Sequence, residues 1–310
     1  MLTLELGPLR VLGWHLGLDC SQAGPIAIGC VSSDDGMEAL KTLRCPPRAW
    51  AVCRCRLPVL SNAPLRPGFP TGGRMSELDE SGAQVLRPHI TVVLAMSADG
   101  KIADYTGAPA RFGSPGDRHH LETQIAQADA TLFGANTLRA YGTTLPITDP
   151  ALLAQRRDRG QPPQPIHMVC SRSGQLDPRL RFFQQPVPRW LVTTPPGAAQ
   201  WSTSAAFDRV LASSTSTGAI AWPTVWTMLR SQGVERLVAM GGGTVVGLLL
   251  AHDWVDEVWL TLCPLLLGGA AAPTLLAHTQ FTEQLAPRLR LHSVRSHNDE
   301  VFLHYHVVRP

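Results

Sequence analysis

Hydrophobic positions from Arg87 onward fall into two patterns. Short apolar runs typical of buried strands recur along the chain, and between them lie stretches whose apolar residues follow a helical spacing. The apolar runs predict strands at 89–96, 129–134, 166–171, 189–194, 208–213, 235–240, 256–269 and 300–308. Because strands alternate with helical stretches, the pattern predicts a layered α/β domain.

Two of the intervening stretches predict helices. In 116–128, Leu121, Ile125 and Ala128 share one face of an amphipathic helix. The stretch 222–233 has a proline near its first turn and ends on a glycine, which is the usual arrangement at the two ends of a helix.

Two of the predicted strands carry a specific expectation. Pro264 lies inside 256–269, and a proline has no amide to donate, so this strand is predicted at an edge of the sheet or at a bulge. The stretch 300–308 alternates and is predicted to close the sheet. We interpret the histidines of LHSVRSHNDEVFLHYH (291–306) as surface and core residues of this strand region, and we predict no metal site.

Residues 1–86 follow neither pattern. Proline and glycine interrupt the short apolar patches, as in LSNAPLRPGFPTGGR. A segment with so little to bury predicts a poorly structured N-terminal extension over 1–86, followed by a folded domain over 87–310. Met75 opens the polar lead-in to the first strand, and two interpretations stay open: translation begins at Met75, or the upstream residues are a genuine tail.

Composition narrows the class of partner. The net charge is +3 and no basic stripe is present, so no nucleic-acid partner is expected. No run of about 18 uncharged apolar residues occurs, and Glu5 and Arg10 interrupt the first apolar stretch, so neither a membrane span nor a secretion signal is predicted. The seven cysteines lack zinc-site spacing and are interpreted as free thiols of a cytoplasmic protein. A small-molecule substrate is the partner that remains.

Candidate chemistry follows three of the predicted strands: AMSADGKIAD (95–104), FGANT (133–137) and AMGGGT (239–244). Ligands of α/β folds bind at the carboxyl ends of strands, and glycines before a helix can hold a phosphate on the helix N-terminal amides. Each motif alone is weak, because an Asp-Gly-Lys turn and a glycine loop are also common as plain turns.

Taken in order and spacing, the motifs are more specific. They lie in RPHITVVLAMSADGKIA, ADATLFGANTLRA and ERLVAMGGGTVVGLLLAHDWVDEVWLTLCPLLLGG. Over about 87–308 these stretches closely resemble the reductase domain of riboflavin biosynthesis, the C-terminal half of the bifunctional deaminase/reductase. The resemblance implies a dihydrofolate-reductase-like α/β fold, a mixed sheet flanked by helices, and an NADPH-dependent homodimeric enzyme.

The resemblance also implies a set of site residues. It places the nicotinamide side at Ala95, the second cofactor loop at Gly134 and Thr137, and the pyrophosphate loop at Gly241, Gly242, Gly243 and Thr244. Ser171 and Arg172 stand where the family contacts the adenosine 2′-phosphate, which a guanidinium can bind, although a solvated arginine is an equal alternative. The candidate catalytic residues are Asp99 and Lys101, and the lysine is expected to face the substrate.

The chain also departs from the family on the substrate side. Met240 stands where the family usually has a glutamate, and a thioether cannot accept a strong hydrogen bond or move a proton. The phosphate-binding arginine of the family's LRA turn is missing from QIAQA, and the family's DNPRLTVR segment is replaced by YGTTLPIT (141–148). Arg139 and Thr143 are possible replacements. We find neither the HAE motif nor the paired-cysteine zinc signature of the deaminase half.

Three functional hypotheses follow. The leading one is an NADPH-dependent reductase that converts 5-amino-6-(5-phosphoribosylamino)uracil to its ribitylamino product. The second is a reductase of the same fold acting on another small carbonyl, imine or pterin-like compound. The third is a non-catalytic nucleotide-binding protein, which the presence of both Asp99 and Lys101 disfavours. The sequence leaves the choice between NADPH and NADH open.

Overall fold

The described part of this computed structural model comprises residues 86–277 and 279–309, together with the backbone of four short strands nearer the N-terminus. These strands are β1 (Leu12–Gly13), β2 (Ile26–Gly29), β3 (Leu40–Leu43) and β4 (Arg56–Leu57), and β1 pairs with β4 and β2 with β3. The chain divides into two units, 1–68 and 69–310. Two expectations from the sequence are a poorly structured extension over 1–86 and a translation start at Met75. Apart from the four short strands, both concern residues outside the described part.

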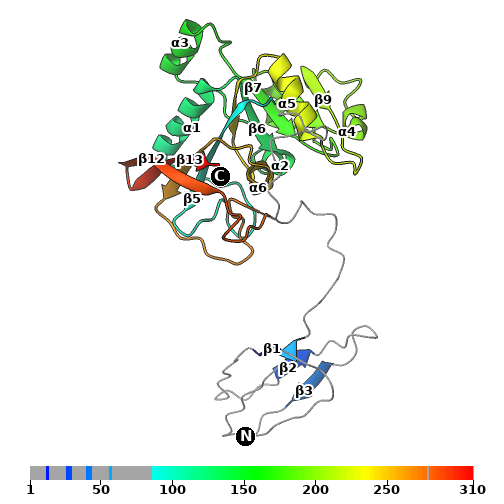
Figure 1. Ribbon diagram of the computed structural model, residues 1–310, viewed down its shortest axis with the longest axis vertical. Helices are drawn as coiled ribbons and strands as arrows, with labels where there is room; N and C mark the ends of the chain where they lie inside the picture. Colours follow the sequence, from blue (N-terminus) through cyan, green and yellow to red (C-terminus); the bar gives the residue numbers. More distant parts are fainter. Residues whose placement is uncertain are drawn as a thin grey trace. The chain divides into compact units, whose positions relative to one another are not determined.

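One mixed sheet forms the centre of the second unit, in the order β12-β13-β11-β5-β10-β6-β7-β8-β9 (Figure 1). From β11 to β9 every neighbouring pair is parallel, whereas β13 runs antiparallel to both β11 and β12. The strands are β5 (His89–Ser97), β6 (Ala130–Gly134), β7 (Ile166–Cys170), β8 (Arg189–Thr193), β9 (Arg209–Ala212), β10 (Arg236–Ala239), β11 (Glu257–Cys263), β12 (Arg288–His297) and β13 (Glu300–Val308).

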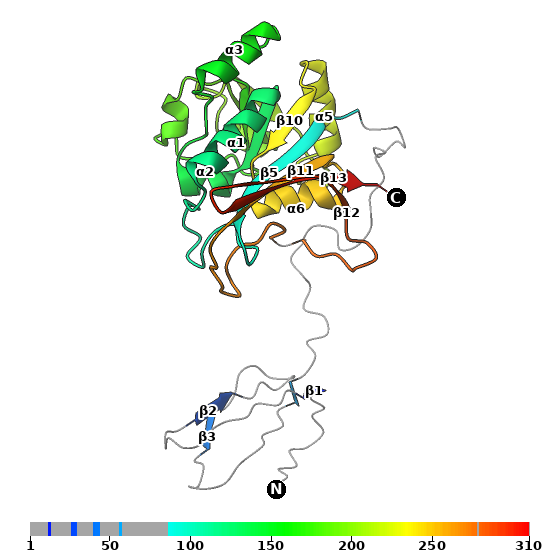
Figure 2. The same ribbon diagram turned by 90° about the vertical axis from the view of Figure 1, so that its left-hand side faces the viewer.

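Helices cover both faces of this sheet (Figures 1 and 2). They are α1 (Pro115–Gln127), α2 (Ala135–Tyr141), α3 (Pro150–Asp158), α4 (Pro195–Ala199), α5 (Trp222–Ser231) and α6 (Gly243–Ala251), with a 3-10 turn at Arg181–Gln184. Ile90 of β5 packs with Trp226 and Leu249, which places α5 and α6 on one face. The side chain of Val93 points to the opposite face of β5, where it packs with Leu121 of α1. The predicted mixed α/β sheet flanked by helices is therefore confirmed.

The helix starts follow from local capping chemistry. The Ser114 side chain accepts hydrogen bonds from two amides of the first turn of α1, and a proline follows it directly. Asp149 caps α3 in the same way, by accepting from the Ala151 amide at 2.7 Å. The sequence analysis missed α3, although DP at its start and two arginines in its last turn are helix signals.

Two strand predictions were wrong in their details. Strand β11 ends at Cys263, directly before Pro264, and it lies between β13 and β5 rather than at an edge. Because the proline follows the strand, its missing amide costs no sheet hydrogen bond. Strand β13 does not close the sheet, since β12 lies outside it. We missed β12 because nearly all its side chains are exposed, so it has no buried face to give an apolar alternation.

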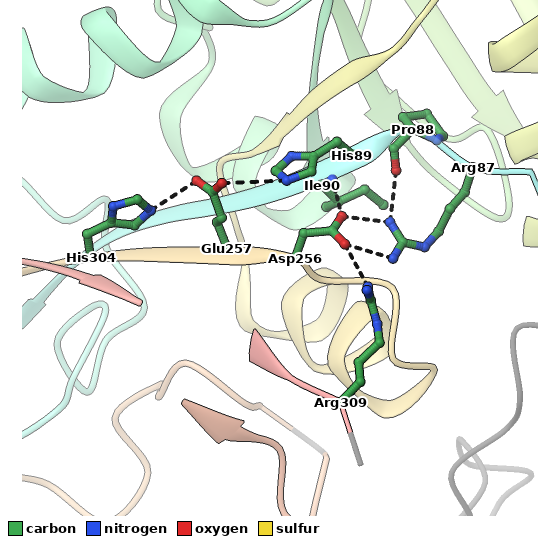
Figure 3. Close-up of polar contacts among 8 residues, drawn as sticks. All are labelled: Arg87, Pro88, His89, Ile90, Asp256, Glu257, His304 and Arg309. Atoms are coloured by element: carbon green, nitrogen blue, oxygen red, sulfur yellow. Dashed lines mark hydrogen bonds and ion pairs between the residues drawn. The ribbon is translucent and has the colours of Figure 1, made fainter. Parts of the chain in front are cut away.

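The carboxylate of Asp256 ties three strands together at the amino end of β5 (Figure 3). Arg87 donates to both carboxylate oxygens at 2.7 and 2.9 Å, Arg309 donates at 2.6 Å and the Ile90 amide at 2.8 Å. The Asp256 amide donates back to the Ile90 carbonyl at 2.9 Å, and the Val307 amide donates to the Asp256 carbonyl at 2.9 Å. Burial would raise the pKa of Asp256, but these donors outweigh it and hold the pKa at about 2.

No helix within 86–277 and 279–309 is long and apolar enough to cross a membrane.

We expect Asp256→Asn to lower the free energy of unfolding by about 3 kcal/mol, because a neutral amide replaces the carboxylate that bonds Arg87, Arg309 and the Ile90 amide. Since the folded-state pKa lies below 3.8, the stabilisation by wild-type Asp256 is present above that pH and is lost as the pH falls toward 2. Urea unfolding between pH 7 and pH 3 measures both effects. Asp158→Asn, on an exposed position of α3, is the control; an equal loss in the two variants would contradict the prediction.

Candidate active site

The predicted site residues follow four strands that are neighbours in the sheet. Strands β5, β10, β6 and β7 lie side by side and parallel, so their carboxyl ends meet at one edge. The structure therefore brings to this edge residues from four separate parts of the chain: Ala95, Asp99, Lys101, Gly134, Thr137, Ser171, Arg172, Gly241, Gly242, Gly243 and Thr244. This is the edge where parallel sheets bind ligands.

The glycine loop after β10 and the loop after β6 contact each other directly. The Gly134 amide donates to the Gly241 carbonyl at 3.2 Å. Gly241 has a φ of +101°, which only glycine adopts without strain, and a Cβ there would lie 2.9 Å from the Leu94 side chain. A Cβ on Gly242 would lie 3.1 Å from the Thr137 hydroxyl oxygen. The two predicted cofactor loops thus pack closely against each other, and no side chain stands between their backbones.

Helix α6 begins in this loop without a side-chain cap. Gly242 occupies the capping position, and within the described part of the chain no group accepts a hydrogen bond from the amides of Gly243 or Thr244. These donors carry the partial positive charge of the helix N-terminus, which suits a phosphate group. The loop therefore fits the pyrophosphate of a dinucleotide.

A short segment after β11 connects the glycine loop to Lys101. A Cβ on Gly243 would lie 2.5 Å from the Thr274 carbonyl oxygen, so only glycine allows this close approach. Thr274 also pairs through its backbone with Lys101, and the Ile102 amide donates to the Pro273 carbonyl at 2.9 Å. These contacts hold the turn that contains Lys101 beside the start of α6.

Asp99 uses its carboxylate to hold a loop. It accepts from the Ser97 hydroxyl at 2.6 Å and from the amides of Leu267 and Gly268 at 3.0 and 2.7 Å. The Ser97 hydrogen bond, followed by those two amides, lowers the pKa of Asp99 to about 2. The side chain is therefore ionised near neutral pH, and its geometry suits positioning of the loop after β11 better than proton donation.

Lys101 stands on a fixed backbone with an available side chain. Its amide donates to the buried Ser97 hydroxyl at 2.9 Å. Among the residues that the structure describes, none makes a hydrogen bond or an ion pair with its ammonium group. An ammonium held in this way at the sheet edge can donate to a bound substrate.

Ser171 and Arg172 follow β7 on a similarly fixed backbone. The Ser171 amide donates to the Val192 carbonyl at 3.0 Å, and the Arg172 carbonyl accepts from the Thr194 hydroxyl at 2.8 Å. The Arg172 side chain is exposed, and no described residue accepts a hydrogen bond from its guanidinium. The geometry is compatible with both alternatives from the sequence, a phosphate ligand and a solvated arginine.

Met240 is partly buried and packs against the apolar interior beside the candidate site. It contacts three apolar clusters on the face covered by α1, and Leu121 and Trp259 belong to one of them. The position at which the family usually carries a glutamate is thus part of the core packing here. A carboxylate in this place would lose hydration without gaining a partner among these neighbours.

The segment 141–148 also has a structural task. Ile147 is buried in a small cluster with α1 and α3, and the Thr143 hydroxyl donates to the Gln185 side chain at 2.7 Å. Arg139 donates to the Asn136 side chain at 2.6 Å and to the Gln175 carbonyl at 3.1 Å. Both candidate replacements for the family's phosphate contacts therefore already have partners within the chain.

The sequence analysis missed a group of acids at the start of α1. Glu300 is buried and accepts from the Ser114 amide and hydroxyl at 2.8 and 2.5 Å. Burial first, and the charge of Glu300 second, raise the pKa of Asp117, whereas a hydrogen bond with Thr261 opposes this. Thr261, the hydrogen-bond partner of Asp117, lies opposite Ala95 in the sheet register. A carboxyl group with a raised pKa can donate a proton there.

A signal for Asp117 was present in the sequence. In SPGD the serine caps the helix and the acid stands three residues later, which resembles a capping box and fixes the acid in the first turn of α1. The acid's partners Thr261 and Glu300 come from strands far along the chain, so its environment was not visible in any local pattern.

Comparison with known proteins identifies the family. Residues 88–303 match the RibD C-terminal domain. The chain belongs to the RibD C-terminal domain family. It is 25% identical over 199 residues to the 2,5-diamino-6-ribosylamino-4(3H)-pyrimidinone 5′-phosphate reductase of Archaeoglobus fulgidus, covering 64% of this chain and 90% of that relative. It is 27% identical over 248 residues to the riboflavin biosynthesis protein RibD of Escherichia coli, covering 75% of this chain and 65% of that protein.

A solved structure shares the fold of this RibD C-terminal domain. The pyrimidine reductase-like protein of Corynebacterium diphtheriae aligns with a TM-score of 0.60 and 22% identity, over 72% of this chain and 93% of that one. The family resemblance inferred from the three strand-end motifs is thereby confirmed.

We expect Met240→Glu to lower the free energy of unfolding by about 1–3 kcal/mol at pH 7, because a carboxylate would enter apolar packing. The size-matched control Met240→Leu is expected to cost less than about 1.5 kcal/mol. Urea unfolding measures both values. A glutamate variant as stable as the leucine variant would mean that an unseen polar contact exists for a carboxylate at this position.

Proposed function

We propose that this chain is an NADPH-dependent reductase of riboflavin biosynthesis, and that it reduces the ribosylamino group of a pyrimidine 5′-phosphate to the ribitylamino product. Family membership and the relatives named as reductases of this pathway support the assignment. The observation that carries it is local: the backbone of Lys101 pairs with Thr274, whose carbonyl lies against Gly243 at the start of α6.

The leading substrate is 5-amino-6-(5-phosphoribosylamino)uracil. A second candidate is the corresponding diamino-pyrimidinone. The relative from Archaeoglobus fulgidus is named as the reductase of that compound, and the match to this chain covers 90% of that relative. The two compounds differ by one amino group that deamination replaces with a carbonyl. A single site can therefore be tested against both.

The cofactor would supply a hydride to C1′ of the sugar once the ribosyl ring has opened to the imine. The amides of Gly243 and Thr244 would hold the pyrophosphate, and Arg172 would hold the 2′-phosphate. Lys101 would hydrogen-bond the sugar or the pyrimidine carbonyl. Asp117, whose pKa is raised, would deliver the proton that the imine nitrogen takes up as the hydride arrives at C1′, so that the C=N bond becomes CH–NH.

A cytoplasmic homodimer is part of the same proposal. Strand β12 is an edge strand with three exposed apolar residues, Leu289, Leu291 and Val294, and such a strand offers a surface for a second copy. Light scattering of the full chain at assay concentration tests the dimer, and a monomeric mass would remove it from the proposal.

The function is tested with the full chain, NADPH and each of the two pyrimidine phosphates, by following the loss of nicotinamide absorbance. We expect turnover with at least one substrate and a kcat lower by about 100-fold or more in Lys101→Ala and in Asp117→Asn, the range for loss of a general acid or base. Lys101→Arg, which keeps the charge, should retain part of the activity. NADPH binding without turnover of either substrate would overturn the assignment.

The choice of cofactor is tested separately at Arg172. We expect Arg172→Ala to raise the KM for NADPH by about tenfold or more and to leave the KM for NADH unchanged, since NADH lacks the 2′-phosphate. Arg157→Ala, which removes an exposed arginine of α3, is the matched control. Equal effects on both cofactors would show that Arg172 is a solvated arginine and not a phosphate ligand.

A further inference from the structure

Three histidines gather on the outer strands of the sheet, away from the candidate active site. They are His292 of β12 and His304 and His306 of β13, and one ring nitrogen of each lies within 4.8 Å of the others. Their ring centroids are 4.8 to 5.3 Å apart. Strand alternation places His304 and His306 on one face, and the pairing of Arg290 with His306 places His292, two residues along β12, on that same face.

His292 stands at a β-bulge. Leu291 pairs with Tyr305 and Ser293 pairs with His304, so His292 is an extra residue between two consecutive pairs. A bulge of this kind redirects a side chain, and bulges are common beside functional sites.

The second feature is the support behind His304. Its Nε2 lies 2.9 Å from a carboxylate oxygen of Glu257, and the other oxygen of Glu257 lies 3.5 Å from His89 Nε2 (Figure 3). Its ring stacks on Trp259 at 4.0 Å between centroids and 7° between planes. The ring is therefore held in place with Nδ1 left for a ligand, and a carboxylate on the far nitrogen is the usual outer partner of a metal-bound histidine.

We propose that His292, His304 and His306 bind one divalent transition-metal ion of the Zn²⁺ type, with a fourth position open to water. Three imidazoles suit zinc, copper or nickel and do not suit magnesium or calcium, which prefer oxygen ligands. Zn–N bonds of about 2.0–2.1 Å in a tetrahedral site place the nitrogens about 3.4 Å apart, so the ring nitrogens close in by at most about 1.4 Å on binding. His292 and His306 are exposed and can move, whereas His304 is held.

This site is separate from the proposed reductase site. In the sheet register Glu257 lies opposite Thr91 and His306, at the amino end of β11, whereas the site residues follow the carboxyl ends of β5 and its neighbours. The metal would join β12 to β13. Because β12 is exposed along its length and has little apolar burial to hold it, such a link would stabilise the strand that most lacks packing.

The test uses the untagged full chain, freed of metal with a chelator and titrated with Zn²⁺ by calorimetry. We expect the double variant His292→Ala/His306→Ala to bind one Zn²⁺ ion per chain fewer than the wild type. In the wild type, this ion should bind with a Kd of about 1 µM or tighter. Glu257→Gln should weaken this ion by about 10- to 100-fold, as loss of an outer-shell partner does. The control His297→Ala removes an exposed histidine of β12 outside the cluster and should change nothing.

A second readout locates the ion without any variant. Zn²⁺ is expected to slow amide hydrogen exchange in residues 288–308 of the wild-type protein. Unchanged exchange there, or the same Zn²⁺ stoichiometry in the double variant as in the wild type, would overturn the proposal. Catalytic turnover plays no part in either measurement.

Discussion

The hydrogen bonds of Asp256 fix the register on which the candidate active site depends. Its side chain and backbone bond Ile90 in both directions, and its carbonyl accepts from Val307, so β11 is fixed against β5 and β13 together. From that start, the parallel register carries Ala95 beside Thr261 and Ser97 beside Cys263 at the far end. A shift by one residue would turn every one of these side chains to the opposite face.

Asp129 does the same on the other side of β10. One of its carboxylate oxygens accepts from the amides of Glu235 and Arg236, and its own amide donates to the Arg236 carbonyl. At the amino edge of the sheet, the carboxylates of Asp256 and Asp129 thus accept hydrogen bonds from amides at the strand ends. The carboxyl edge is built differently, from glycines and from cations without partners among the described residues. At the amino edge these polar groups are hydrogen-bonded within the chain, whereas the carboxyl edge has donors that are available to a ligand.

The sequence predicted this arrangement where the signal was local. The apolar runs located β5 to β11 and β13, and the three strand-end motifs carried the family resemblance, because both patterns lie within a few consecutive residues. It failed where the cause was distant. Strand β12 has no buried face, so only pairing with β13 defines it. The acid pair Asp117 and Glu300, and the bulge at His292, exist only because segments far apart in the sequence are neighbours in the fold.

The same distinction separates the two sides of the candidate site. The proposed cofactor loop consists of backbone, and an added Cβ on Gly241, Gly242 or Gly243 would crowd Leu94, Thr137 or Thr274, so replacements there are expected to disturb the fold. On the substrate side, side chains do the work. Met240 and the segment 141–148 take part in apolar packing. Asp117 can give a proton and Lys101 can give a hydrogen bond. Substrate choice is a difference of a few such contacts, so it can shift without any change in the sheet that carries them.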